Sequence, residues 1–149
     1  MKGAKLQIAR RFRASPEKVF AACTDPTVMA RWFGPKDFRV TELNAEVRQG
    51  GTFAFRMVGP PGEMAAGGTY ELVEPPTRLV HTWRWTDGLA EFPPDGITSR
   101  ITYEFSADGS GTRLTFTQEG LPDQDEADSH EQGWSEALDK LEAILGEPS

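Results

Sequence analysis

The ten residues LVHTWRWTDG (79–88) decide which face of this protein is buried. Because side chains alternate between the two faces of a β-strand, Leu79, His81, Trp83 and Trp85 share one face. The smaller or charged residues between them share the other. Two indoles and an imidazole form a wide, partly polar wall. Such a wall either fills a core or lines a cavity, and the strand alone leaves both interpretations open.

Signals for a strand and two short helices precede this stretch. Residues 5–14 (KLQIARRFRA) alternate in the manner of a strand, with Leu6, Ile8, Arg10 and Phe12 on one face. Ser15-Pro16 and Asp25-Pro26 then each predict a helix start, because an N-cap side chain followed by proline is typical of that position. Gly34-Pro35 predicts the end of the second helix.

The middle of the chain alternates between apolar runs and turn residues, which predicts a meander of strands. The predicted strands span residues 38–47, 51–58, 67–73, 78–85, 99–107 and 112–119. The breaks between them are Gly50-Gly51 and residues 59–68 (GPPGEMAAGG), 74–77 (EPPT), 86–96 (TDGLAEFPPDG) and 107–111 (ADGSG). Asp108-Gly109 in the last break favours a tight hairpin.

A long helix over residues 125–145 ends the chain. Trp134, Leu138, Leu141 and Leu145 recur at helical spacing and mark its buried face. Acidic residues gather at its start, where the helix dipole favours them. The order is therefore strand, two helices, six strands and helix. It predicts an α+β fold in a single domain, residues 1–149, with one antiparallel sheet whose buried face is covered by the last helix.

Composition excludes several classes of protein. The 149 residues are 38% apolar and 26% charged, as in a globular domain, and no apolar run reaches the length of about 18 residues that a membrane span needs. A net charge of −7 argues against a nucleic-acid partner. The single cysteine, Cys23, permits no internal disulfide, and no export signal is present, so a cytoplasmic location is expected.

The charge is unevenly distributed along the chain. Residues 1–60 carry 11 basic and 5 acidic side chains, whereas residues 61–149 carry 5 and 18. This asymmetry either provides a docking face for a protein partner or is mixed within the folded domain.

Several segments resemble the homologues of the activator of the ninety-kilodalton heat-shock chaperone's ATPase. They are RRFRASPEKVFAACTDPTVMARWFGP (10–35), Gly50-Gly51, GGTYELVEPPTRLVHTW (67–83), GTRLTF (111–116) and QGWSEALDKLEAIL (132–145). The resemblance spans nearly the whole chain. It implies the START-like (SRPBCC) superfamily and the helix-grip fold of the birch-pollen allergen: a curved seven-stranded antiparallel sheet around the C-terminal helix, with an apolar ligand cavity between them. A part in the stress response is also implied.

The resemblance favours a cavity over a solid core as the role of the aromatic wall. Because tryptophan side chains are the largest, we expect the face with Trp83 and Trp85 to point inward. The apolar faces of the other strands, with Leu72 on one of them, and of the helix would then point toward these tryptophans. Trp32 and Phe33 would close one end. The candidate ligand-binding residues are Trp32, Phe33, Phe53, Phe55, Met57, Tyr70, His81, Trp83, Trp85, Ile101, Tyr103, Phe105, Trp134, Leu138 and Leu141.

No residue pattern predicts a metal site, a cofactor or a catalytic group. His81 and His130 are the only histidines, and each is either a general acid or base or a hydrogen-bonded residue at the cavity rim. Glu126 and His130 alone make a weak metal pair. Arg10 either binds a carboxylate, of a protein side chain or of a ligand, or extends to solvent from its strand. Cys23 is expected to be a buried, inert thiol.

Three functions follow from these expectations. The first is a module that binds a small hydrophobic or amphipathic molecule in the cavity. The second is a co-chaperone that activates a heat-shock chaperone ATPase through its charged surface, although 149 residues leave no room for the further N-terminal domain of the eukaryotic activator. The third is a cyclase, dehydratase or hydrolase that uses His81, Arg10 or Tyr103, which is less expected than a non-enzymatic role. Monomer and homodimer both remain open.

Overall fold

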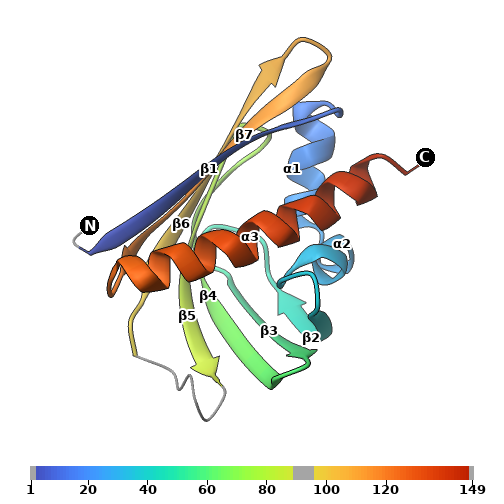
Figure 1. Ribbon diagram of the computed structural model, residues 1–149. Helices are drawn as coiled ribbons and strands as arrows, with labels where there is room; N and C mark the ends of the chain where they lie inside the picture. Colours follow the sequence, from blue (N-terminus) through green and yellow to red (C-terminus); the bar gives the residue numbers. More distant parts are fainter. Residues whose placement is uncertain (1–2, 89–95, 148–149) are drawn as a thin grey trace.

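A curved antiparallel sheet of seven strands wraps around the C-terminal helix in the computed structural model of the chain (Figure 1). Residues 3–88 and 96–147 are described by this structure. The elements are β1 (Ala4–Phe12), α1 (Pro16–Thr24), α2 (Pro26–Trp32), β2 (Arg39–Ala45), β3 (Thr52–Gly59), β4 (Gly62–Glu74), β5 (Arg78–Asp87), β6 (Ser99–Asp108), β7 (Gly111–Leu121) and α3 (Gln124–Leu145).

The strand order in the sheet is β1-β7-β6-β5-β4-β3-β2. Strands β2 to β7 form a meander, and β1 pairs with β7 from Ala4 opposite Leu121 to Phe12 opposite Thr112. The two ends of the sheet are therefore the first two strands of the chain, and α1 and α2 carry the chain between them. The predicted α+β helix-grip architecture is confirmed.

Side-chain caps begin all three helices where the sequence predicts a start. The Ser15 hydroxyl accepts a hydrogen bond from the Lys18 amide at 3.3 Å, and the Asp25 carboxylate accepts one from the Thr27 amide at 2.9 Å. Asp123 caps α3 in the same way, through the Glu126 amide at 2.9 Å. These bonds satisfy amide groups that have no partner within the helix.

Helix α3 crosses the concave face of the sheet and buries the predicted stripe (Figure 1). Ala137, Leu138 and Leu141 are fully buried, and Trp134 is 5% exposed. They meet the inward faces of the strands, where Phe53, Phe55, Met57, Tyr70, Leu79, His81, Trp83, Ile101, Tyr103 and Phe105 are all buried. The inward orientation of the aromatic wall on β5 is therefore confirmed.

The break predicted over residues 59–68 is present but much shorter than predicted. The turn is confined to the two residues between Gly59 and Gly62, and β4 continues from there to Glu74. Met64 and Ala66 pair with Met57 and Phe55, so the partner strand stabilises a segment whose composition is typical of a loop. Its glycines serve close packing, since a Cβ on Gly68 would lie 2.0 Å from the Thr82 carbonyl oxygen.

The orientation predicted for Leu72 is wrong. The pairing of β4 with β5 shifts between Tyr70, which faces His81, and Leu72, which faces Val80. Because opposed residues share a face, Leu72 lies on the outer face, and Val73 packs against the core opposite Leu79. The extra residue is a β-bulge, which simple alternation does not foresee. Of the predicted break over residues 86–96, positions 89–95 lie outside the described residues.

We expect Leu138→Ala to lower the free energy of unfolding by about 2–5 kcal/mol, because the side chain is fully buried between helix and sheet. Urea unfolding followed by circular dichroism measures the change. Glu142→Ala on the exposed face of the same helix is the control and should change it by less than about 0.5 kcal/mol. Equal losses in both variants would contradict the assignment of the buried face.

Candidate functional site

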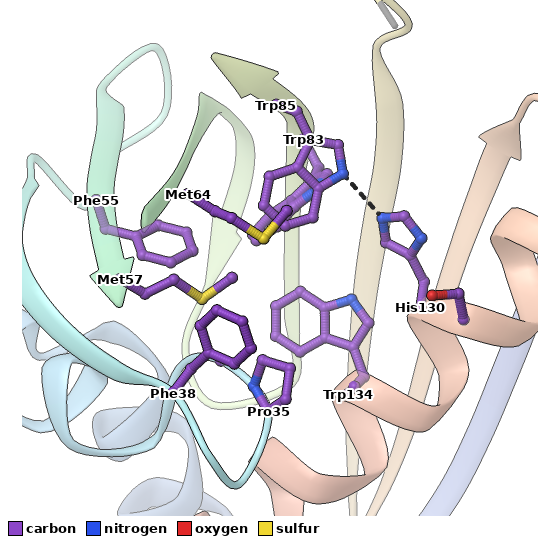
Figure 2. Close-up of a pocket in the computed structure, with 12 residues that line it drawn as sticks. Pro35, Phe38, Phe55, Met57, Met64, Trp83, Trp85, His130 and Trp134 are labelled. Carbon is purple, nitrogen blue, oxygen red and sulfur yellow. Dashed lines mark hydrogen bonds between the residues drawn. The ribbon is translucent and has the colours of Figure 1, made fainter. Parts of the chain in front are cut away.

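One cavity of about 160 Å³ lies at an end of the core, and Figure 2 shows how its side chains converge. Its wall comes from β3, β4 and β5, from the loop after α2, and from the first half of α3. The lining residues are Gly34, Pro35, Phe38, Phe55, Met57, Met64, Trp83, Trp85, Ser129, His130, Gly133 and Trp134.

The lining of this cavity is almost entirely apolar. Five aromatic rings and two thioethers form most of it, and Ser129 and His130 are its polar side chains within the described part of the chain. Phe38, Met64 and Trp85 are half-buried and Ser129 is exposed, so the cavity opens to solvent along this side. An apolar space with a few polar groups at its edge is typical of a small-molecule site.

A hydrogen bond between Trp85 and His130 closes part of the opening. The Trp85 indole N–H donates to His130 Nε2 at 3.2 Å, which Figure 2 marks as a dashed line. The other ring nitrogen, Nδ1, lies 2.8 Å from the Glu126 carbonyl oxygen. Since that oxygen can only accept, the proton of the neutral imidazole is on Nδ1, and both ring nitrogens are occupied.

A buried chain of hydrogen bonds fixes the ring at the back of the cavity. The Trp134 indole N–H donates to Gln118 Oε1 at 2.9 Å, and Gln118 Nε2 donates to the Ser99 hydroxyl at 2.9 Å. Ser99 in turn donates to the Trp83 carbonyl oxygen at 3.3 Å. Gln118 and Ser99 are almost fully buried, and sequence reasoning missed both. The available signal was a polar residue, Gln118, on the strand face that Leu114 and Phe116 mark as inward.

Lys140 holds the loop that forms the floor of the cavity. Its Nζ donates to the carbonyl oxygens of Phe33, Pro35 and Phe38, at 3.2, 3.3 and 3.4 Å. Burial of the ammonium lowers the pKa of Lys140. Three carbonyls engage its three donors, so the loop after α2 is tied directly to α3.

His81 lies in the packed core rather than at the cavity. Its Nδ1 lies 2.8 Å from the Thr82 carbonyl oxygen, and its Nε2 lies 3.2 Å from the Tyr103 hydroxyl. The carbonyl must accept, so Nδ1 carries the proton and Tyr103 donates to Nε2. Burial lowers the pKa of His81 to about 4, and burial raises the pKa of Tyr103. Both groups are therefore neutral near pH 7.

The sequence model of the family described as activator of Hsp90 ATPase homologue 1-like proteins matches residues 13–146 of the chain. The chain belongs to this family.

Solved structures of similar proteins share the fold of this chain over nearly its whole length. A protein from Chromobacterium violaceum is 26% identical, with a TM-score of 0.83 over 97% of this chain and 98% of its own. The AHSA1 protein from Silicibacter pomeroyi is 28% identical, with a TM-score of 0.82 over 95% and 97%. No curated protein matches the chain significantly. The resemblance read from the sequence, and with it the START-like helix-grip fold, is confirmed.

Some of the candidate ligand-binding residues line the cavity, and the others pack in the core. Those that line it are Phe55, Met57, Trp83, Trp85 and Trp134. Those that pack elsewhere are Trp32, Phe33, Phe53, Tyr70, His81, Ile101, Tyr103, Phe105, Leu138 and Leu141. His130 lies at the rim of the cavity with both ring nitrogens hydrogen-bonded, which is one of the two alternatives that the sequence leaves for it. The lining residues that sequence reasoning missed are Gly34, Pro35, Phe38, Met64, Ser129 and Gly133.

Most of the space between the sheet and α3 is filled rather than hollow. Trp83 and Trp134 are in edge-to-face contact with ring centroids 5.1 Å apart, and Phe116 packs on Trp134 at 4.8 Å. A cavity along the whole length of the helix is therefore not present. The apolar cavity lies at the end where β3, β4 and β5 meet the loop after α2 and the first half of α3.

Charges from the two halves of the sequence meet within the fold. Arg10, which the sequence leaves either paired or extended to solvent, contacts Asp139 at 2.6 Å with its side chain 21% exposed. Further pairs that join residues 1–60 to residues 61–149 are Arg31–Glu147 at 2.6 Å, Arg56–Asp87 at 3.1 Å and Arg11–Asp108 at 3.6 Å. Basic side chains of residues 1–60 and acidic side chains of residues 61–149 thus partly neutralise one another in the folded domain.

Within residues 3–88 and 96–147, no helix is both long enough and apolar enough to cross a bilayer. In the same ranges, no three His, Cys, Asp or Glu side chains are arranged to hold a metal ion. Cys23 is buried, and burial raises the pKa of its thiol.

His81 makes stability pH-dependent. Its pKa in the folded protein, about 4, lies below the usual 6.5 of the unfolded chain, so between these values only the unfolded state binds the proton. The free energy of unfolding therefore falls as the pH drops from 6.5 to 4, by roughly 3 kcal/mol on account of this group.

The measurement is urea unfolding at pH 7, 5.5 and 4.5 of the wild type and of His81→Gln. The difference in the free energy of unfolding between wild type and His81→Gln should shrink as the pH falls. His130→Gln keeps His81, so its free energy of unfolding should fall with pH as much as that of the wild type. A difference that stays constant over this range would show that His81 is not held neutral by burial.

Proposed function

We propose that this protein binds a small hydrophobic or amphipathic molecule in the 160 Å³ cavity. The observation that carries the proposal is the lining: five aromatic rings and two thioethers converge on a space that opens to solvent on one side. An apolar cavity of comparable size, about 150 Å³, is known to admit benzene. Burial of apolar ligand surface supplies the affinity.

The size of the cavity limits what it can enclose. Typical ligand pockets measure roughly 300–1,000 Å³, so this one takes a single ring or one end of a longer molecule. Ser129 and His130 stand at the open side, where a polar end of an amphipathic ligand would meet them and solvent. The apolar part would lie deeper, against Trp134, Phe55 and Met57.

A catalytic function has less support from the geometry. Of the groups considered for acid–base chemistry, neither His81 nor Tyr103 lines the cavity, and Arg10 is paired with Asp139. His130 does line it, but both of its ring nitrogens are engaged. General acid–base catalysis needs a group within hydrogen-bond reach of the substrate.

A co-chaperone function rests on the family description and on the uneven charge along the sequence. Four of the ion pairs described above join the basic first part to the acidic remainder. These charges are therefore partly satisfied within the domain, which weakens the argument for a dedicated docking face. The cavity supports small-molecule binding more directly.

Toluene, acetophenone and 1-hexanol are suitable probes of the cavity. We expect at least one of them to quench or shift tryptophan fluorescence, because three indoles line the space. A ligand at tenfold its dissociation constant should stabilise the protein by about 1.4 kcal/mol and raise the melting temperature by roughly 3–6 °C. No change in fluorescence or melting temperature with any probe would contradict the proposal.

Gly133→Met is the variant that should abolish this binding. Gly133 lines the cavity on α3, and a Cβ there makes an ordinary contact of 3.4 Å with Pro35, so the added side chain can fill the space. Replacing a helical glycine should leave stability unchanged or raise it by up to about 1 kcal/mol. Ala143→Met, on an exposed position of the same helix, is the matched control and should bind as the wild type does.

A further inference from the structure

Trp83 lines the cavity, and its indole nitrogen is a buried hydrogen-bond donor beneath the lining. Trp83 is 4% exposed, and its rings pack against Trp134 at 5.1 Å and against Phe55 and Trp85 at 5.5 Å. Its Nε1 is fully buried and has no hydrogen-bond partner among the residues that the structure describes. A buried donor without an acceptor is uncommon in native proteins.

The other three tryptophans do have acceptors for their indole N–H groups. Trp32 donates to the Ala22 carbonyl oxygen at 3.0 Å, Trp85 to His130 at 3.2 Å and Trp134 to Gln118 at 2.9 Å. Among residues 3–88 and 96–147, an acceptor is thus present for every indole N–H except that of Trp83. This position is one that an acceptor on a bound molecule would fill.

We propose that Trp83 Nε1–H is the recognition group of the cavity, and that the ligand is a neutral single-ring aromatic compound with a hydrogen-bond acceptor next to the ring, such as an aryl ketone. This inference rests on the proposed function and narrows it from any small hydrophobic molecule to one chemical class. The ring occupies the apolar space, and the ligand's oxygen accepts the hydrogen bond that the protein leaves unmade.

The surroundings favour a neutral acceptor over a carboxylate. No cationic side chain is among the described residues that line the cavity. Lys140 is close to the loop after α2, but three backbone carbonyls engage its ammonium. A carboxylate would lose its hydration without a counter-charge, which is costly, whereas a ketone oxygen needs only one donor.

A ligand must move a neighbouring side chain to reach the nitrogen, because Nε1 is covered. Met57 and Met64 line the same cavity, and their unbranched thioether chains adapt to a new shape more easily than the rings around them. Figure 2 shows both side chains directed into the space between Phe55, Phe38 and the tryptophans.

Acetophenone and α-methylstyrene form a pair of probes that tests this inference. They share the ring and the overall shape. Acetophenone carries a carbonyl oxygen, which accepts a hydrogen bond, where α-methylstyrene carries a methylene group, which does not. We expect acetophenone to bind wild-type protein about tenfold more tightly in a fluorescence titration, which corresponds to about 1.4 kcal/mol.

Trp83→Phe removes the donor but keeps a ring, so the affinity ratio of the two probes should fall to about one while α-methylstyrene still binds. Trp32→Phe is the control. It removes an N–H that already has a partner, the Ala22 carbonyl oxygen, at a residue that does not line the cavity, so the tenfold ratio should persist.

The outcomes distinguish the role of Trp83 from the proposed function, which is hydrophobic binding in the cavity. Equal binding of both probes to the wild type, or a tenfold ratio retained in Trp83→Phe, overturns the role of Trp83 and leaves hydrophobic binding standing. If neither probe binds, the role of Trp83 is overturned, and the proposed function is overturned with it when toluene and 1-hexanol also fail to bind. Should Trp83→Phe not fold, NMR of the wild type decides: acetophenone, and not α-methylstyrene, must shift the Trp83 indole proton downfield, and an unshifted proton overturns the inference.

Discussion

The packing of Trp134 against the sheet is the contact on which the rest of the structure depends. Its ring meets Phe116 at 4.8 Å, Trp83 at 5.1 Å and Phe33 at 5.8 Å, so one side chain of α3 touches β7, β5 and the end of α2. Its N–H is held by Gln118. Aromatic contacts of this kind contribute burial and a preferred geometry together, which fixes the height of the helix above the sheet.

The position of the cavity follows from that contact. Toward β6 and β7, rings on the inward face of the sheet fill the space, as in the contacts of Tyr103 with Phe105 and Phe116. Toward β3 and β4 the sheet curves away, and the cover is a loop that Lys140 ties to α3 through carbonyl groups. A loop held by its backbone brings fewer large side chains inward than a strand does, and the space of about 160 Å³ remains there.

The fold was readable from the sequence because its signals are local. Ser15-Pro16, Asp25-Pro26, Asp108-Gly109 and the α3 stripe each lie within a few residues, and each corresponds to an observed cap, turn or buried face. The start of β4 was missed because its glycines and prolines are typical of loops, and only pairing with β3 overrides that preference. The face of Leu72 depends on a bulge, which has no signature in the alternation of this strand.

The cavity was harder to place because it is defined by contacts between distant residues. Pro35, Met64 and Gly133 belong to a loop, a strand and a helix, and no pattern links them until the chain is folded. His81 is on the inward face, as predicted, yet its bonds to Thr82 and Tyr103 place it in the dry core. An inward orientation therefore does not distinguish a residue that packs from one that lines a space.

Diffraction from a crystal of the protein pressurised with xenon tests the central claim most directly, because an apolar cavity admits xenon without needing a specific ligand. The account predicts a xenon peak among Met57, Trp83 and Trp134. Density that shows this volume filled by protein side chains or by ordered water, with no xenon bound, would contradict it.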